Sequence, residues 1–314
     1  MNGTASNSHP LFRLMTGWLA CVALSHAAAQ QSTGDYTPRL GQPGKDVMWL
    51  PTPDLMVDSM LRMAEVTSRD FVVDLGSGNG KIPITAARRF GARALGLEFN
   101  PDLVEVSKLR AREARVADKV EFRQADIFST DYSSASVVTL YLLPEINLKL
   151  RPTLIKMNPG TRISSHSFDM GSWRPDEITL IGSARTMLWV VPAHVAGAWT
   201  LRYAGKKAEA PVDIVLRQRF QEIEGDAALG PARVSLQDVR MRGNEIHFGV
   251  RDAGGWQLHF SGRITANRIV GQVAQAGRGR SRFEAVRGDA AAAFPEAEAT
   301  EAEKSDAVRV MDAQ

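Results

Sequence analysis

Short apolar runs alternate with longer amphipathic segments along the first part of the chain. Five runs predict buried strands, at residues 71–75, 92–98, 120–128, 136–141 and 161–166. The segments between them have the apolar spacing of surface helices, so each is expected to pack one face on a sheet. Two later runs, residues 178–181 and 186–191, predict an antiparallel edge. The alternation predicts an α/β fold with a mostly parallel sheet and helices on both faces.

The pattern changes after Pro192 to short strands separated by turns, which Gly-Asn, Gly-Gly and Ala-Asn pairs mark. The expected strands are residues 198–203, 212–221, 232–240, 245–250, 256–261, 268–273 and 282–286. Residues 194–288 therefore predict a small antiparallel sheet or barrel, which follows an α/β domain over residues 47–193. The length of 314 residues is consistent with about two domains.

Both ends of the chain differ in composition from these domains. Residues 1–29 hold one Arg, an apolar run and an Ala-x-Ala site, which predicts a cleaved signal peptide and an exported protein. The alternative is a poorly ordered extension or a misplaced start codon, with the protein in the cytoplasm. Residues 30–46 have the Gly-, Pro- and Ser-rich composition of a linker. Residues 289–314 are rich in Ala and Glu and predict a disordered or weakly helical tail.

The net charge of +3 is unevenly distributed along the chain. Residues 46–193 carry 18 Lys and Arg against 18 Asp and Glu, so the α/β domain lacks the positive field that nucleic-acid binding requires. Residues 194–288 carry 15 against 9, an excess that either attracts an acidic partner or has no functional meaning. Nucleic acid is therefore disfavoured as a substrate.

A glycine-rich turn follows the first predicted strand, with Gly76, Gly78 and Gly80 at alternate positions. Glycines let the backbone turn sharply and approach a ligand closely. Dinucleotide-binding turns have the spacing G-x-G-x-x-G, whereas here Lys81 occupies the place of the last glycine. Asp74 at the strand end would repel a pyrophosphate, but it suits a cationic amino group such as that of S-adenosylmethionine.

Two further acids, Glu98 and Asp126, end the second and third predicted strands. An acid in the first position can accept both ribose hydroxyls, and one in the second can accept from the adenine amino group. One such acid alone is more readily explained by solvation at a loop mouth, but three in succession favour a binding site. The candidate cofactor-binding residues are Thr52, Asp74, Gly76, Ser77, Gly78, Gly80, Glu98, Phe99, Asp126 and Ile127. The turn that contains Thr52 either covers the methionine end of the cofactor or packs on the sheet.

If the ligand is S-adenosylmethionine, which donates a methyl group, the acceptor is expected over the ends of the fourth and fifth strands, where Tyr141, Glu145 and His166 are the candidate catalytic residues. Methyl transfer from a sulfonium is an in-line displacement, which needs alignment and exclusion of water more than an obligatory base. Tyr141 either orients an amine or packs at the strand end. His166 is either a base near neutral pH or a structural hydrogen-bonding residue. No cluster of metal ligands stands out in the sequence.

Residues 47–173 resemble a bacterial group of class I, seven-strand methyltransferases through the motifs W-x-P-T-P, D-L-G-S-G-x-G, L-Y-L-L-P-E and S-H-x-F-D-M-G-x-W. They are more distantly similar to seven-strand protein lysine methyltransferases, including the mitochondrial family that modifies an ATP synthase subunit. The resemblance implies a Rossmann-like fold, S-adenosylmethionine as cofactor, and five contacts to it: Asp74, Gly76, Gly78, Glu98 and Asp126. It does not fix the acceptor.

The sequence thus predicts an S-adenosylmethionine-dependent methyltransferase that acts on a protein amine of the lysine type or on a small molecule. A non-catalytic exported protein, in which the Rossmann-like half is retained as a binding or scaffold module, is the alternative. Export favours that alternative because S-adenosylmethionine is made in the cytoplasm. A nicotinamide-dependent oxidoreductase is less consistent with the glycine spacing and with Asp74.

Overall fold

The computed structural model describes residues 50–203, 211–251, 257–275, 279–288 and 298–312, together with Gly255 and Gly277. The predicted signal peptide and linker, residues 1–29 and 30–46, lie outside the described residues, as does the first part of the predicted tail. Within the part of the chain that is described, no helix is long and apolar enough to cross a membrane.

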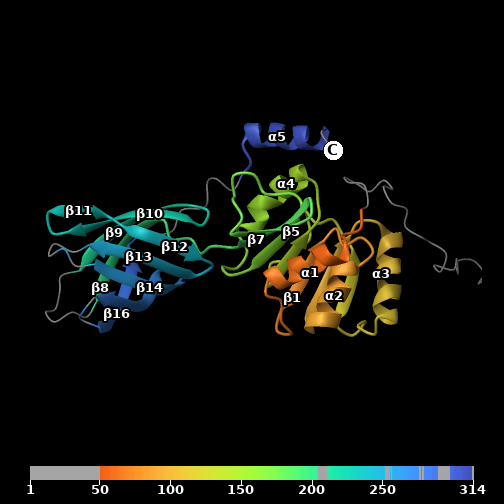
Figure 1. The fold of residues 1–314 in the computed structure, drawn as a ribbon, viewed down its shortest axis with the longest axis horizontal. Coiled ribbons are helices and arrows are strands. Elements are labelled where there is room, and N and C mark those ends of the chain that lie inside the picture. Colours follow the sequence, from red (N-terminus) through yellow and green to blue (C-terminus); the bar gives the residue numbers. More distant parts are fainter. Residues whose placement is uncertain are drawn as a thin grey trace, which may run out of the picture. The chain divides into compact units, whose positions relative to one another are not determined.

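A seven-stranded sheet forms the first part of the fold (Figure 1). Its strands are β1 (Phe71–Leu75), β2 (Arg93–Glu98), β3 (Val120–Gln124), β4 (Val137–Leu140), β5 (Arg162–His166), β6 (Glu177–Ile181) and β7 (Ala184–Val190). The order is β3-β2-β1-β4-β5-β7-β6; β1 to β5 are parallel, and β7 is antiparallel to both β5 and β6. The predicted α/β fold and its antiparallel edge are confirmed. The strand order reverses at β1, so a crevice at the carboxyl ends of β1 and β4 is the expected ligand site.

Four helices cover the two faces of this sheet. They are α1 (Asp54–Met63), α2 (Lys81–Phe90), α3 (Pro101–Glu113) and α4 (Pro144–Leu154). Apolar residues of α1, α2 and α3 belong to one hydrophobic cluster, and those of α4 belong to a second. Asn100 caps α3 as expected, because its side chain accepts a hydrogen bond from the Asp102 N–H before Pro101 starts the helix.

The glycine turn packs tightly on the strands beneath it. A Cβ atom at Gly80 would lie 2.6 Å from the Phe122 ring, and one at Gly96 would lie 2.4 Å from the same ring and 2.6 Å from Ser77 Oγ. Gly80 also has a left-handed φ of 77°. These contacts leave no room for larger residues, so glycine at these positions brings the turn down onto β2 and β3.

A nine-stranded antiparallel sheet follows, in the order β11-β10-β9-β8-β16-β15-β14-β13-β12 (Figure 1). Its strands are β8 (Gly197–Tyr203), β9 (Val212–Arg219), β10 (Glu222–Leu229), β11 (Ala232–Ser235), β12 (Gln237–Arg242), β13 (Glu245–Arg251), β14 (Gln257–Thr265), β15 (Arg268–Gln275) and β16 (Gly279–Arg287). Alternate residues fill its own hydrophobic core. The antiparallel sheet was predicted, but β10 was missed because its charged and glycine residues hide the alternation.

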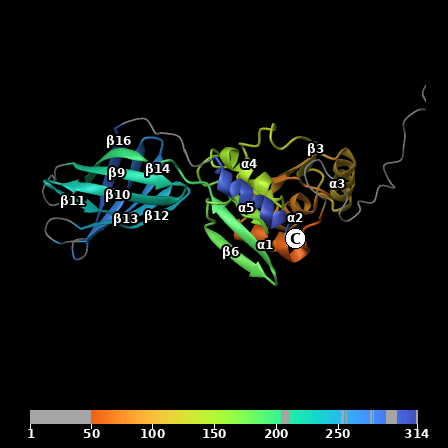
Figure 2. The ribbon, with the colours of Figure 1, turned by 90° about the horizontal axis from the view of Figure 1, so that it is seen from above.

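Residues 301–312 form a helix, α5 (Glu301–Asp312), where the composition predicted a disordered or weakly helical tail. The prediction of disorder is wrong for this segment. The helix contacts α4, and Ala307 is buried (Figures 1 and 2). Tertiary packing stabilises the helix, which explains why the tail's composition gave no clear signal.

We expect Gly96→Ala to destabilise the chain by about 1–3 kcal/mol, since its methyl group would overlap the Phe122 ring. Calorimetric thermal unfolding should show the lower Tm. Gly288→Ala is the matched control, because within the described part of the chain a Cβ there has only the Ala198 carbonyl oxygen within 4 Å, at 3.9 Å. Equal effects of the two substitutions would contradict the packing described here.

Candidate active site

The glycine turn after β1 is tied to β2 by main-chain hydrogen bonds. The N–H groups of Gly76 and Ser77 both donate to the Leu97 carbonyl oxygen, at 2.9 and 3.0 Å. Gly76 and Gly78 have left-handed φ values of 76° and 53°, which glycine adopts without strain. A Cβ atom at Gly76 would lie 2.9 Å from the end of the Leu142 side chain, which would have to move to admit it.

Glu98, at the end of β2, joins the turn to the start of α3. Its Oε2 accepts a hydrogen bond from the Gly78 N–H at 2.8 Å, and its Oε1 accepts from the Asn100 N–H at 2.9 Å. Each carboxylate oxygen can accept more than one hydrogen bond. Glu98 is therefore oriented by the main chain while it keeps acceptor capacity for a pair of ligand hydroxyls, as the sequence predicted for a ribose.

Asp74 is a buried carboxylate at the point where the strand order reverses. Thr139 Oγ1 on β4 donates a hydrogen bond to Asp74 Oδ1 at 2.6 Å. Burial raises the pKa of Asp74 to about 7, and the negative charge of Glu98 contributes to the same shift, against the effect of Thr139. No cation is paired with Asp74 among the described residues, so a ligand ammonium group would supply a counter-charge.

The adenine end of the predicted site lies after β3. Asp126 Oδ1 accepts a hydrogen bond from the Phe128 N–H at 2.9 Å, which fixes a turn there. Ile127 packs at the edge of a hydrophobic cluster, and Phe99 is 46% exposed. Ile127 and Phe99 provide the apolar surface on which a purine ring can pack.

The residues present fit S-adenosylmethionine. Ser77 packs closely on Gly96, where a Cβ atom would lie 2.6 Å from its Oγ, and this Oγ is buried and has no hydrogen-bond partner among the described residues. The three acids match an ammonium group, a pair of ribose hydroxyls and an exocyclic amine. Thr52, also predicted to contact the cofactor, is buried just before α1. The individual cofactor contacts stay predictions.

Aromatic rings gather on the acceptor side, at the ends of β4 and β5. The ring centroids of Tyr141 and His166 lie 4.0 Å apart, and Phe168 stacks on Tyr141 at 6.5 Å with an interplanar angle of 15°. Burial lowers the pKa of His166 to about 4, so its ring is neutral at pH 7 and a weak base. Its Nδ1 is buried and has no hydrogen-bond partner in the described chain. The rings of Tyr141, His166 and Phe168 together form an apolar surface, which we call the aromatic wall. The geometry supports this role for His166 more than it supports general-base catalysis.

Sequence reasoning did not single out Phe168, although it lies in the motif S-H-x-F-D-M-G-x-W. Its position depends on Ser167, which adopts an unusual left-handed φ of 66° that turns the chain after β5. Glu145 is exposed in the first turn of α4, and its carboxylate forms none of the described hydrogen bonds or ion pairs. The structure brings Tyr141 and His166 together, and the catalytic roles of all three residues stay predictions.

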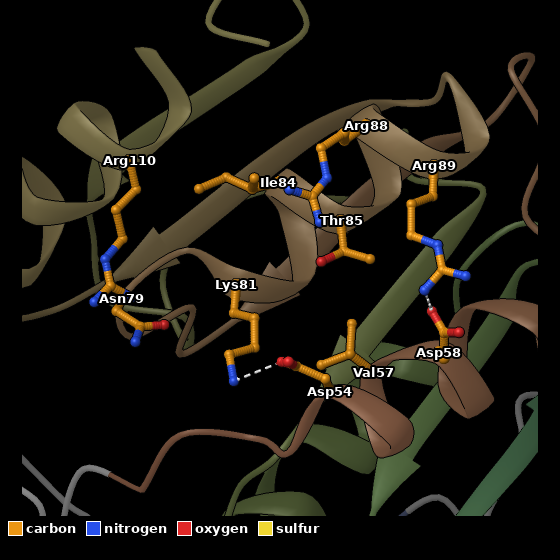
Figure 3. Close-up of a pocket in the computed structure, with 10 residues that line it drawn as sticks. All are labelled: Asp54, Val57, Asp58, Asn79, Lys81, Ile84, Thr85, Arg88, Arg89 and Arg110. Atoms are coloured by element: carbon orange, nitrogen blue, oxygen red, sulfur yellow. Dashed lines mark hydrogen bonds and ion pairs between the residues drawn. The ribbon is translucent and has the colours of Figure 1, made fainter. Parts of the chain in front are cut away.

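A pocket of about 260 Å³ lies beside α1 and α2 and is lined by several cationic side chains (Figure 3). None of the ten lining residues is a predicted cofactor or catalytic residue. Lys81 pairs with Asp54 at 2.9 Å, and Arg89 pairs with Asp58, so α1 is tied to the helix that follows the glycine turn. These pairs are partly exposed and contribute little to stability, but they help to position the start of α1.

The described ranges hold no group of three or more His, Cys, Asp or Glu residues arranged to bind a metal ion. Nothing in the proposed chemistry requires a metal, because the ligand itself carries the activated methyl group.

Comparison with known proteins agrees with this geometry. Residues 74–177 match the model of the ANTKMT methyltransferase domain. A protein-lysine N-methyltransferase of Saccharolobus islandicus is 38% identical over 154 residues, which cover 47% of this chain and 96% of that protein. The chain belongs to the class I S-adenosylmethionine-dependent methyltransferases related to protein-lysine methyltransferases.

Other relatives of this methyltransferase match over different shares of their length. The mouse adenine nucleotide translocase lysine N-methyltransferase is 31% identical over 128 residues, 40% of this chain and 55% of that protein. The structure of an RNA methyltransferase from Salinibacter ruber in complex with S-adenosyl-L-homocysteine is 46% identical. The match covers 51% of this chain and 100% of the Salinibacter chain, with a TM-score of 0.46.

The affinity of the methyltransferase for S-adenosylmethionine should depend on pH through Asp74. Below about pH 7 this carboxyl is increasingly protonated, so affinity should fall by up to about tenfold per pH unit. Above about pH 8 the ligand's own amino group loses its charge, so binding should be strongest near pH 7–8. Calorimetric titration between pH 5.5 and 9 measures this, and a flat profile over pH 5.5–7.5 would contradict it.

Asp74→Asn should stabilise the ligand-free protein while it abolishes cofactor binding. In the unfolded chain the pKa of Asp74 is near 3.8, so the folded state loses stability as pH rises from about 4 to about 7. Asn removes this loss and still accepts the hydrogen bond from Thr139. We expect Tm to rise by at least about 3 °C at pH 8 and to be unchanged at pH 4. A lower Tm at pH 8 would refute this role of the buried charge.

Proposed function

We propose that this methyltransferase transfers a methyl group to the ε-amino group of a lysine in a protein. The observation that carries the proposal is the aromatic wall of Tyr141, His166 and Phe168 at the carboxyl edge of β4 and β5. An aromatic face attracts an alkylammonium group and its polarised methyl groups. The names of the Saccharolobus and mouse relatives, both lysine N-methyltransferases, support the same acceptor.

S-adenosylmethionine supplies an electrophilic methyl group on a positively charged sulfur. The acceptor nitrogen must be a neutral amine, which forms a bond to the methyl carbon while the carbon–sulfur bond breaks and its electron pair stays on sulfur. The methylated nitrogen then carries the positive charge, and it releases a proton to solvent before any further transfer. No covalent intermediate on the enzyme is required, because the methyl group passes directly from sulfur to nitrogen.

The aromatic wall affects this reaction through its burial and its lack of positive charge. Loss of water in the half-buried site lowers the pKa of an entering lysine and raises the fraction of nucleophilic amine, whereas the aromatic faces favour the charged form that the nitrogen acquires on methylation. His166 is neutral at pH 7 and therefore adds no repulsive positive charge beside the sulfonium. The ring of Tyr141 would stabilise the positive charge that sulfur and nitrogen share in the transition state. In this proposal Asp74 binds the ammonium group and Glu98 the ribose hydroxyls, on the two sides of the sulfonium.

The proposal is tested with tritium-labelled S-adenosylmethionine and two acceptors, poly-L-lysine and a denatured protein extract of the source cells, with RNA from the same cells as a third arm. We expect label in protein, recovered as methyl-lysine after acid hydrolysis. Label that is sensitive to ribonuclease, or that appears only in small molecules, would overturn the lysine proposal. Asp74→Asn is the inactive control.

Removing the Tyr141 ring should slow methyl transfer to lysine. We expect Tyr141→Ala to lower kcat/KM for poly-L-lysine by about 30-fold, the equivalent of about 2 kcal/mol of cation–π interaction, and Tyr141→Phe to stay within about fivefold of the wild type. The dissociation constant of S-adenosylhomocysteine should be unchanged in both. Equal losses in Ala and Phe would assign the effect to the hydroxyl group and contradict the role of the ring.

A further inference from the structure

The segment that follows β5, residues 167–172, borders the aromatic wall, and we call it the acceptor-side loop. Main-chain groups of this loop are held by α4 at two positions. Asn147 Nδ2 donates to the Phe168 and Asp169 carbonyl oxygens, at 3.1 and 3.3 Å, and Arg151 donates to the Met170 carbonyl oxygen at 2.9 Å. Because the Phe168 ring stacks on Tyr141, the position of the loop sets the shape of the wall.

The C-terminal helix α5 packs beside α4 and contacts the same loop (Figure 2). Glu303 Oε1 accepts a hydrogen bond from the Ser172 N–H at 2.7 Å and lies 2.7 Å from an Arg151 guanidinium nitrogen. The Arg151 side chain is fully buried, and it also donates to the Glu298 carbonyl oxygen at 2.7 Å. One carboxylate of α5 therefore contacts both the loop and the arginine that anchors the loop to α4.

The fit around Glu303 is close. A Cβ atom at Gly171, where φ is 63°, would lie 2.6 Å from Glu303 Oε1. Although burial opposes ionisation, hydrogen bonds from Arg151, Thr300 and Ser172 hold the pKa of Glu303 far below its usual range. The carboxylate is therefore charged at any pH at which the protein would be assayed, and the contact does not act as a pH switch.

We propose that Glu303 is a positioning residue for the acceptor site. Its carboxylate binds both Arg151 and the Ser172 N–H, so it holds the acceptor-side loop against α4. The loop in turn fixes Phe168 beside Tyr141. The C-terminal segment, which follows the nine-stranded sheet in the chain, is then part of the catalytic unit. The consequence for acceptor binding rests on the proposed function, whereas the ordering of the loop does not. Cofactor binding is unaffected because the contacts of Glu303 lie on the acceptor side of the sheet.

Glu303→Gln tests the contacts of Glu303 with Arg151 and Ser172, with little disturbance to the start of the helix. Thr300 and Glu303 form a capping box at the start of α5: the Thr300 N–H donates to Glu303 Oε2 at 2.8 Å, and the Glu303 N–H donates to Thr300 Oγ1 at 3.2 Å. Glutamine also serves in this motif, so the helix start is retained while the charge that faces Arg151 is lost. Glu301→Gln is the matched control, because Glu301 is exposed and, among the described residues, pairs only with Lys304 on the same helix.

The experiment measures hydrogen exchange of peptides covering residues 166–173 in the full chain, together with methyl transfer to poly-L-lysine. In Glu303→Gln we expect loop exchange to be at least tenfold faster and KM for poly-L-lysine to be at least fivefold higher. The dissociation constant of S-adenosylhomocysteine should stay close to wild type. The Tm should fall, because the buried Arg151 guanidinium loses the carboxylate that it pairs with. Glu301→Gln should match the wild type throughout.

Unchanged loop exchange in Glu303→Gln would overturn the proposal, and so would a fall in kcat with KM and loop exchange unchanged. If Glu303→Gln unfolds, Glu303→Asp takes its place: the shorter acid keeps the charge but withdraws it from Ser172, and it should give an intermediate exchange rate. If the wild type methylates no lysine, the lysine proposal fails by itself. The exchange measurement still decides whether Glu303 orders the loop.

Discussion

A buried carboxylate without a counter-charge is the constraint on which this active site depends. Asp74 lies where the strand order reverses, and its one described hydrogen bond, from Thr139, only partly compensates for the loss of water. Such a group costs the ligand-free protein stability, and a cationic ligand removes that cost. The site is therefore selective before any other contact is made, because an anionic pyrophosphate would meet repulsion at the point where an ammonium group is attracted.

The rest of the cofactor site is built so that the main chain does the positioning. The glycine turn is hydrogen-bonded to the end of β2, and Glu98 is held by two N–H groups before any ligand arrives. Preorganised groups lose little entropy on binding. The acceptor side follows the same logic, since side chains of both α4 and α5 hydrogen-bond to the backbone of the loop that carries Phe168.

The cofactor half was predictable from the sequence because its signals are local. A strand, an acid and alternate glycines are adjacent in the chain, and each acid ends its own strand. What could not be predicted depends on distant partners. Burial of Asp74 beside Thr139 requires the β1–β4 pairing, and α5 is recognisable only beside Arg151, 152 residues before Glu303. Phe168 was missed because its place depends on the left-handed backbone of Ser167, which the residue type does not indicate.

The central claim is that the acids at the carboxyl edge of the sheet bind S-adenosylmethionine. Calorimetric titration of the full chain with S-adenosylhomocysteine at pH 7.5, beside Glu98→Gln, tests it most directly. The account predicts micromolar binding by the wild type and binding at least about 30-fold weaker in the variant, which loses acceptor capacity for the two ribose hydroxyls. Absence of binding by a folded wild-type chain, or equal binding by the variant, would contradict the account.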